Sequence, residues 1–269
     1  MIENLILGSA RWGSNISKKT VFALLDKFIK SGGRHIDGAM NYPINGVVED
    51  FGLANNFLSE WISLNPKVNL NVFVKLGSIN NTGGPQSDLS AKTINQNFEI
   101  LQQNFGESLG GVGVHWDNRG VDKTEQINET IQELDRFHHN GFRIGISGVK
   151  EIKTYLELAP NLQSVWEIQV KETVDNHTMR ENYQSFFPEA SYLIYGINIG
   201  KSIARTSIRD SLKNRIQDRK QESKADLYFL WIKKILESHG VEKIIIGPRT
   251  LQQLESILNR MSDNFEKLA

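Results

Sequence analysis

The residues of this chain best able to do chemistry stand in or just after short strand-like runs: Asp37, Tyr42, Lys75 and His115. A tyrosine near a buried lysine can donate a proton at neutral pH, because the cation favours the phenolate and lowers a pKa that is ordinarily about 10. A buried lysine needs a carboxylate to stay charged, and Asp37 can supply it. Imidazole both donates and accepts, so His115 can orient a carbonyl or assist the proton transfer. The pattern therefore predicts protonation of a carbonyl oxygen, with Tyr42 as the general acid.

Short apolar runs alternate with longer amphipathic segments along the whole chain, as is typical of repeated βα units around a parallel sheet. Eight strands are expected, over residues 5–8, 35–37, 71–75, 111–115, 143–147, 164–169, 192–195 and 243–246. Eight helices are expected, one from an N-cap at Ser17 to a stop at Ser31 and the others over 48–64, 91–105, 125–140, 150–158, 178–186, 225–238 and 251–268. This count predicts the α/β class and a single (β/α)8 TIM barrel, a parallel eight-stranded barrel with outer helices that forms one domain over residues 1–269.

Active residues of such barrels lie where the strands end, on the C-terminal face. Five polar residues close their expected strands: Asp37, Lys75, His115, Ser147 and Gln169. Their positions predict that they meet around one pocket.

In this order and context the motifs resemble those of the aldo-keto reductase family. They are RHID around Asp37 with Tyr42 after it, VKLG around Lys75, GVHWD around His115, RIGISG near the middle, and IIIGPRT followed by QLE near the C-terminus. The resemblance implies an NADP(H)-dependent oxidoreductase that reduces an aldehyde or ketone, such as a sugar or sugar derivative, to the alcohol. In such an enzyme nicotinamide supplies the hydride, Tyr42 supplies the proton, and no metal takes part.

The resemblance also implies a set of cofactor contacts: Trp12, Ser147, Gln169, Tyr195, Gly247, Arg249 and Gln253. Ser147 and Gln169 correspond to residues that bind the nicotinamide carboxamide, while Tyr195 corresponds to the aromatic residue that stacks on the ring. Trp12 resembles a further wall of that pocket, and a packing role for it is equally open. The last three residues precede or begin the final helix and resemble a phosphate segment. Arg249 could grip an adenosine 2′-phosphate with its guanidinium group, which favours NADP(H) over NAD(H).

Four positions depart from the family pattern. Gly148 stands where an asparagine usually follows Ser147, and Pro43 replaces the usual glycine after Tyr42. Gly196 stands where a serine is common, and Ile257 where the last helix usually offers an asparagine to adenine. Each lost hydrogen bond is worth about 0.5–1.5 kcal/mol. We therefore expect cofactor contacts to be weakened more than the catalytic positions.

Composition limits the classes of partner. Lys plus Arg and Asp plus Glu both number 31, so no net charge favours nucleic acid or an anionic membrane, and the absence of cysteine excludes disulfides and thiolate sites. The N-terminal residues lack the basic region of a signal peptide, and no apolar run reaches the ~18 residues of a membrane span. We expect a cytoplasmic protein, monomeric or weakly homo-oligomeric, whose partner is a small-molecule carbonyl compound.

Two other functions remain open. One is a metal-dependent barrel hydrolase with His35, Asp37 and His115 as ligands. The other is a non-catalytic relative that binds nucleotide as a sensor or regulatory subunit, which the altered cofactor positions would suit. The segment 200–224 carries eight Lys or Arg against three Asp or Glu, and is either a basic loop that closes over a phosphorylated cofactor or a solvated helix.

Overall fold

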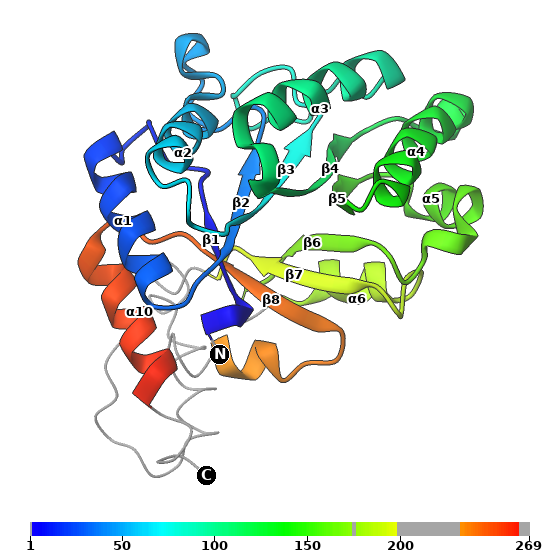
Figure 1. The fold of residues 1–269 in the computed structure, drawn as a ribbon. Coiled ribbons are helices and arrows are strands. Elements are labelled where there is room, and N and C mark those ends of the chain that lie inside the picture. Colours follow the sequence, from blue (N-terminus) through cyan, green and yellow to red (C-terminus); the bar gives the residue numbers. More distant parts are fainter. Residues whose placement is uncertain (1, 174–175, 198–231, 264–269) are drawn as a thin grey trace.

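The computed structural model describes residues 2–173, 176–197 and 232–263, which form a closed barrel of eight parallel strands in sequence order (Figure 1). The strands are β1 (Leu5–Gly8), β2 (His35–Ala39), β3 (Asn71–Leu76), β4 (Leu109–Asp117), β5 (Arg143–Val149), β6 (Glu167–Lys171), β7 (Ser191–Tyr195) and β8 (Val241–Ile246). Pairing of β8 with β1 closes the ring. The expected TIM barrel is confirmed.

Helices surround the barrel, and α1 and α10 pack side by side (Figure 1). They are α1 (Lys18–Lys30), α2 (Leu53–Leu64), α3 (Ala91–Phe105), α4 (Thr124–His139), α5 (Ile152–Leu158), α6 (Thr178–Gln184) and α10 (Leu251–Asp263). Short 3-10 turns lie at Ile2–Asn4, Val48–Asp50, Gly106–Ser108, Val121–Lys123 and Pro160–Leu162. None of the described helices combines the length and apolar character needed to cross a membrane.

Local sequence explains where these helices begin and which face they bury. The Ser17 side chain accepts a hydrogen bond from the backbone N–H of Thr20 and so caps α1 as expected. Ser90 caps α3 in the same way, through the N–H of Thr93. The inner face of α1 buries the apolar residues Val21, Leu24, Leu25 and Phe28.

Several expected boundaries were wrong. The helix expected over 48–64 is interrupted at Gly52, whose φ of +78° ends a short 3-10 turn before α2 begins. The strand expected over 164–169 is shifted, because β6 starts at Glu167. Strands β2, β3, β4 and β5 extend one or two residues further than expected, so their polar residues lie just inside the strand ends.

Two expected helices lie partly outside the described residues. Of the helix expected over 225–238, residues 232–236 are described and helical, and residues 264–268 of the last expected helix lie outside the described range.

The side chain of Phe73 on β3 packs against the glycines of β4 and β5. An added Cβ at Gly113 or Gly145 would come within 2.9 or 3.0 Å of the Phe73 ring. It would also meet a neighbouring backbone oxygen, at 2.6 Å for Gly113 and 2.3 Å for Gly145. The two glycines therefore let β4 and β5 approach the aromatic ring, and the barrel is packed rather than hollow below its mouth.

Candidate active site

The carboxyl ends of the strands surround a cavity of about 900 Å³. All four expected catalytic residues line it: Asp37, Tyr42, Lys75 and His115. Six of the seven expected cofactor residues line it too: Ser147, Gln169, Tyr195, Gly247, Arg249 and Gln253. The volume is of the size typical for small-molecule and cofactor sites.

An ion pair between β2 and β3 forms the floor of the cavity. Lys75 Nζ lies 2.5 Å from Asp37 Oδ1, and the two side chains are only 3% and 6% exposed. Burial lowers the pKa of Lys75 from its ordinary value, while the charge and hydrogen bond of Asp37 oppose that shift. The same carboxylate oxygen accepts a 2.8 Å hydrogen bond from Gln169 Nε2. The ion pair is thus removed from water, and Asp37 Oδ1 accepts hydrogen bonds from both Lys75 and Gln169.

Tyr42 lies against this ion pair at the start of the loop after β2. Lys75 Nζ is 5.2 Å from the centroid of its ring, and the residue is 8% exposed. We expected the ammonium to lower the phenol pKa, but the pKa of Tyr42 is raised well above its ordinary value, first by burial and then by Asp37 and Tyr195. That expectation was wrong because burial of the phenol has the largest effect on its pKa. Tyr42 therefore holds its proton at neutral pH, as an acid must before it donates.

His115 faces Tyr42 edge-on, with ring centroids 6.0 Å apart. Its Nδ1 is hydrogen-bonded to the Ser78 hydroxyl at 3.0 Å, and its ring stacks on Trp116 at 4.0 Å. Burial, and after it the charge of Lys75, lowers the pKa of His115 well below the ordinary value. His115 is therefore neutral, and its imidazole can donate or accept one hydrogen bond toward the cavity without placing a second positive charge beside Lys75.

The residues expected near a nicotinamide come from three further strands. Ser147 on β5, Gln169 on β6 and Tyr195 on β7 follow one another around the barrel and open onto the cavity. Gln169 Nε2 donates one hydrogen bond to Asp37, so its amide oxygen and its second N–H are the groups that could meet a ligand. Trp12 is different: it is 1% exposed and does not line the cavity, which favours the packing role.

A phosphate could be held where β8 feeds α10. Gly247 is exposed, and a Cβ added there meets no atom within 4 Å, so backbone is open to close approach. Arg249 is exposed at the rim, its N–H donating to Gln253 Oε1 at 2.8 Å. The N-terminus of α10 adds the positive end of a helix dipole. These groups fit a dinucleotide phosphate.

Backbone conformation and nearby side chains explain why positions 148 and 196, which depart from the family pattern, are glycine. Gly148 has a φ of +74°, and a Cβ there would lie 2.5 Å from Cδ1 of Trp116. An asparagine at this position would thus collide with the indole. Gly196 has a φ of +80°, and its Cβ would lie 2.8 Å from the flexible Lys171 side chain. Ile257 lines the cavity, and Pro43 follows Tyr42 through a cis peptide bond.

The three residues expected as metal ligands in the hydrolase alternative, His35, Asp37 and His115, do not come together around one point. His35 is the first residue of β2, where the charges of Lys243 and Arg143 act on it, whereas His115 is near the far end of β4. Within the described ranges, no group of three His, Cys, Asp or Glu residues could hold a metal ion.

Sequence reasoning missed Ser78, which fixes the His115 ring. It follows Lys75-Leu76-Gly77, and a serine three residues after the catalytic candidate Lys75 was the available signal. It also missed the side chains of Arg119 and Tyr155, which contact Asp117 behind the cavity wall. The basic segment 200–224 lies outside the described residues.

Comparison with known proteins agrees with this geometry. A model described as the aldo/keto reductase family matches residues 4–168. No curated protein matches the chain. Two solved structures of candidate aldo-keto reductases from Pseudomonas aeruginosa share its fold, at TM-scores of 0.63 and 0.64 and identities of 15% and 16%. Each comparison covers 96% of this chain and 90% or 91% of the other.

The lowered pKa of His115 predicts a loss of stability in mild acid. Unfolded histidine takes up a proton near pH 6.5, whereas folded His115 does not, so the free energy of unfolding falls as the pH drops below about 6.5. His115→Gln should flatten this part of the curve, measured by urea unfolding between about pH 7.5 and 5.5. A residual slope is expected from His35, whose pKa is lowered to about 4. An imidazole carbon-13 signal of His115 that titrates near pH 6.5 would contradict the prediction.

Proposed function

This chain belongs to the aldo/keto reductase family, and from that premise we propose that it reduces an aldehyde or ketone to the alcohol with NADPH. The observation that carries the proposal is the buried Lys75–Asp37 pair beneath Tyr42. A charged pair with both side chains more than nine-tenths buried costs desolvation energy. Its position against a phenol in an open cavity supports a role in proton transfer.

Each side chain at the floor of the cavity has a distinct role in this proposal. When bound, the nicotinamide cofactor supplies the hydride. Tyr42 keeps its proton until the carbonyl oxygen gains negative charge, and then donates it. Lys75, anchored by Asp37, places a positive charge beside the developing tyrosinate. Neutral His115, with Nδ1 tied to Ser78, orients the carbonyl oxygen through its other nitrogen.

Binding and orientation fall to the surrounding residues. Ser147 and the amide group of Gln169 suit the carboxamide of nicotinamide, and Tyr195 suits stacking on its ring. Gly247, Gln253 and the N-terminus of α10 suit a phosphate, and Arg249 suits an adenosine 2′-phosphate. The apolar parts of the lining, such as Ile16 and Trp116, exclude water from the hydride acceptor.

The wider proposal is a cytoplasmic protein, monomeric or weakly homo-oligomeric, acting on a small-molecule carbonyl compound. Sugars and sugar derivatives are included in that substrate class. The non-catalytic alternative is less well supported, because a nucleotide sensor has no need of a buried ion pair and an imidazole around Tyr42.

Tyr42→Phe tests the acid directly, because it keeps the ring and removes the proposed proton. We expect turnover of a generic aromatic aldehyde to fall by ~10²-fold or more, with nearly unchanged affinity for NADPH. Tyr192→Phe, which removes a buried hydroxyl at the other end of the barrel, is the control for the loss of a hydrogen bond. Close to full activity in the Tyr42→Phe protein would remove the acid assignment.

Arg249→Ala tests the choice of cofactor. If the guanidinium pairs with the 2′-phosphate, NADPH affinity should fall by roughly 1.5–3 kcal/mol while NADH binding changes little, because only NADPH carries that charge. Nicotinamide fluorescence during titration measures both. An equal loss for the two cofactors would place Arg249 on the shared pyrophosphate instead.

A further inference from the structure

Trp116 has a backbone conformation that its residue type disfavours. Its φ of +60° is the only positive value at a non-glycine position in the described parts of the chain. The left-handed region is unfavourable for a residue with a bulky side chain. Such strain persists only where the surroundings hold the backbone in place, and it is found most often at functional sites.

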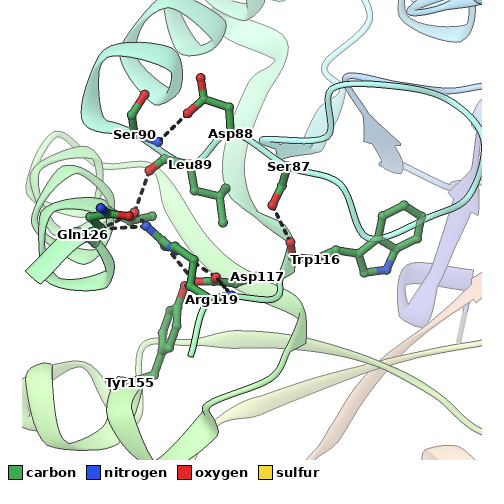
Figure 2. Close-up of polar contacts among 10 residues, drawn as sticks. Ser87, Asp88, Leu89, Ser90, Trp116, Asp117, Arg119, Gln126 and Tyr155 are labelled. Atoms are coloured by element: carbon green, nitrogen blue, oxygen red, sulfur yellow. Dashed lines mark hydrogen bonds and ion pairs between the residues drawn. The ribbon is translucent and has the colours of Figure 1, made fainter. Parts of the chain in front are cut away.

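The Trp116 side chain lies on the cavity side of this strained backbone. The indole lines the cavity and stacks on His115 at an interplanar angle of 26°. Space for it exists because position 148 is glycine, where a Cβ would meet the indole at 2.5 Å. The Trp116 carbonyl oxygen accepts a 2.8 Å hydrogen bond from Ser87 Oγ on the loop after β3 (Figure 2).

The next residue, Asp117, is held from several directions. Arg119 donates to both carboxylate oxygens, from Nε at 2.9 Å and from Nη2 at 2.7 Å (Figure 2). The Tyr155 hydroxyl on α5 donates to Oδ2 at 2.8 Å. The Asp117 carbonyl accepts from the N–H of Lys150 at 2.8 Å. Asp117 and Tyr155 are 1% and 0% exposed, so these charge-assisted contacts at a buried carboxylate hold the end of β4 in one geometry.

Arg119 extends these contacts to two other elements. Its Nη1 donates to the carbonyl of Gln126 at 2.8 Å, and its Nη2 to Thr130 Oγ1 at 2.9 Å, both on α4. Thr130 in turn donates to the carbonyl of Leu89 at 2.7 Å, on the loop that carries Ser87. The contacts on both sides of Trp116 are therefore parts of one connected network.

We propose that Asp117, Arg119 and Tyr155 form a positioning unit that holds Trp116 in its left-handed conformation and so fixes the indole and the His115 imidazole against the cavity. None of the three lines the cavity, so they act through the two residues that do. The functional half of this inference rests on the proposed carbonyl reduction. A merely structural network would stabilise the barrel without setting the geometry of Trp116.

A matched pair of tyrosine variants separates the two roles. Tyr155 and Tyr192 are both 0% exposed, and each hydroxyl donates one 2.8 Å hydrogen bond. Tyr192 donates to the carbonyl of Phe187 near the start of β7, at the opposite end of the barrel from the cavity. Tyr155→Phe and Tyr192→Phe thus each remove one hydroxyl that has no solvent exposure, and only the first removes it from the unit.

The direct readout is fluorine NMR of protein labelled with 5-fluorotryptophan, with the Trp116 signal assigned by its loss in Trp116→Phe. Tyr155→Phe should shift or broaden that signal, and Tyr192→Phe should leave it in place. The second readout is kcat/KM for an aromatic aldehyde. Because the Trp116 indole and the His115 imidazole would be misplaced, Tyr155→Phe should lower kcat/KM by about 10-fold, whereas Tyr192→Phe should leave it unchanged.

Every result decides the proposal. A Trp116 signal that stays in place in Tyr155→Phe, or moves equally in both variants, overturns it. A moved signal with unchanged kcat/KM also overturns it, because the unit would then not serve the reaction. If the wild-type protein reduces no carbonyl compound, the proposed function fails, and the fluorine signal alone decides whether the unit positions Trp116. If Tyr155→Phe does not fold, Arg119→Lys, which keeps the charge but loses the forked contact, must move the signal in its place.

Discussion

The buried ion pair between Asp37 and Lys75 is the interaction on which the site depends. Parallel pairing of β2 with β3 sets Asp37 opposite Phe73, two residues before Lys75, so the lysine must reach back along the sheet to its partner. Removing either partner leaves an uncompensated buried charge, which typically costs about 3–5 kcal/mol. Gln169 on β6 bonds the same carboxylate oxygen from across the barrel. The Asp37 carboxylate therefore bonds both to the neighbouring strand β3 and to the distant strand β6, and the ion pair places a positive charge beside Tyr42.

The wall of the cavity follows from a second constraint, the space available at the ends of β4 and β5. A glycine at position 148 admits the indole of Trp116, which in turn covers one face of His115. Ser78 fixes the imidazole from the loop after β3. The altered family position at Gly148 is thus explained by packing within this chain. The indole therefore presents an aromatic surface to the cavity beside His115.

The barrel and the location of the site could be predicted from the sequence, because each depends on local pattern. Lys75 ends an apolar run, which indicated a buried ammonium, and Asp37 was the carboxylate expected to keep it charged. The direction of the Tyr42 pKa shift could not be predicted, because it depends first on how deeply the phenol is buried in the folded chain. The break at Gly52 requires a positive φ that a helical apolar pattern conceals. The contact of Tyr155 with Asp117 spans 38 residues, and no spacing rule reports it.

The most direct test of the account is the pH dependence of turnover in Lys75→Met, measured in the direction of alcohol oxidation together with the melting temperature. In that direction Tyr42 must lose its proton, and a nearby ammonium favours the loss. The account predicts a folded protein that binds cofactor, is severely less active, and has a profile moved to higher pH. Activity that simply follows the folded fraction, with an unshifted profile, would contradict it and leave the Lys75–Asp37 pair as a structural ion pair alone.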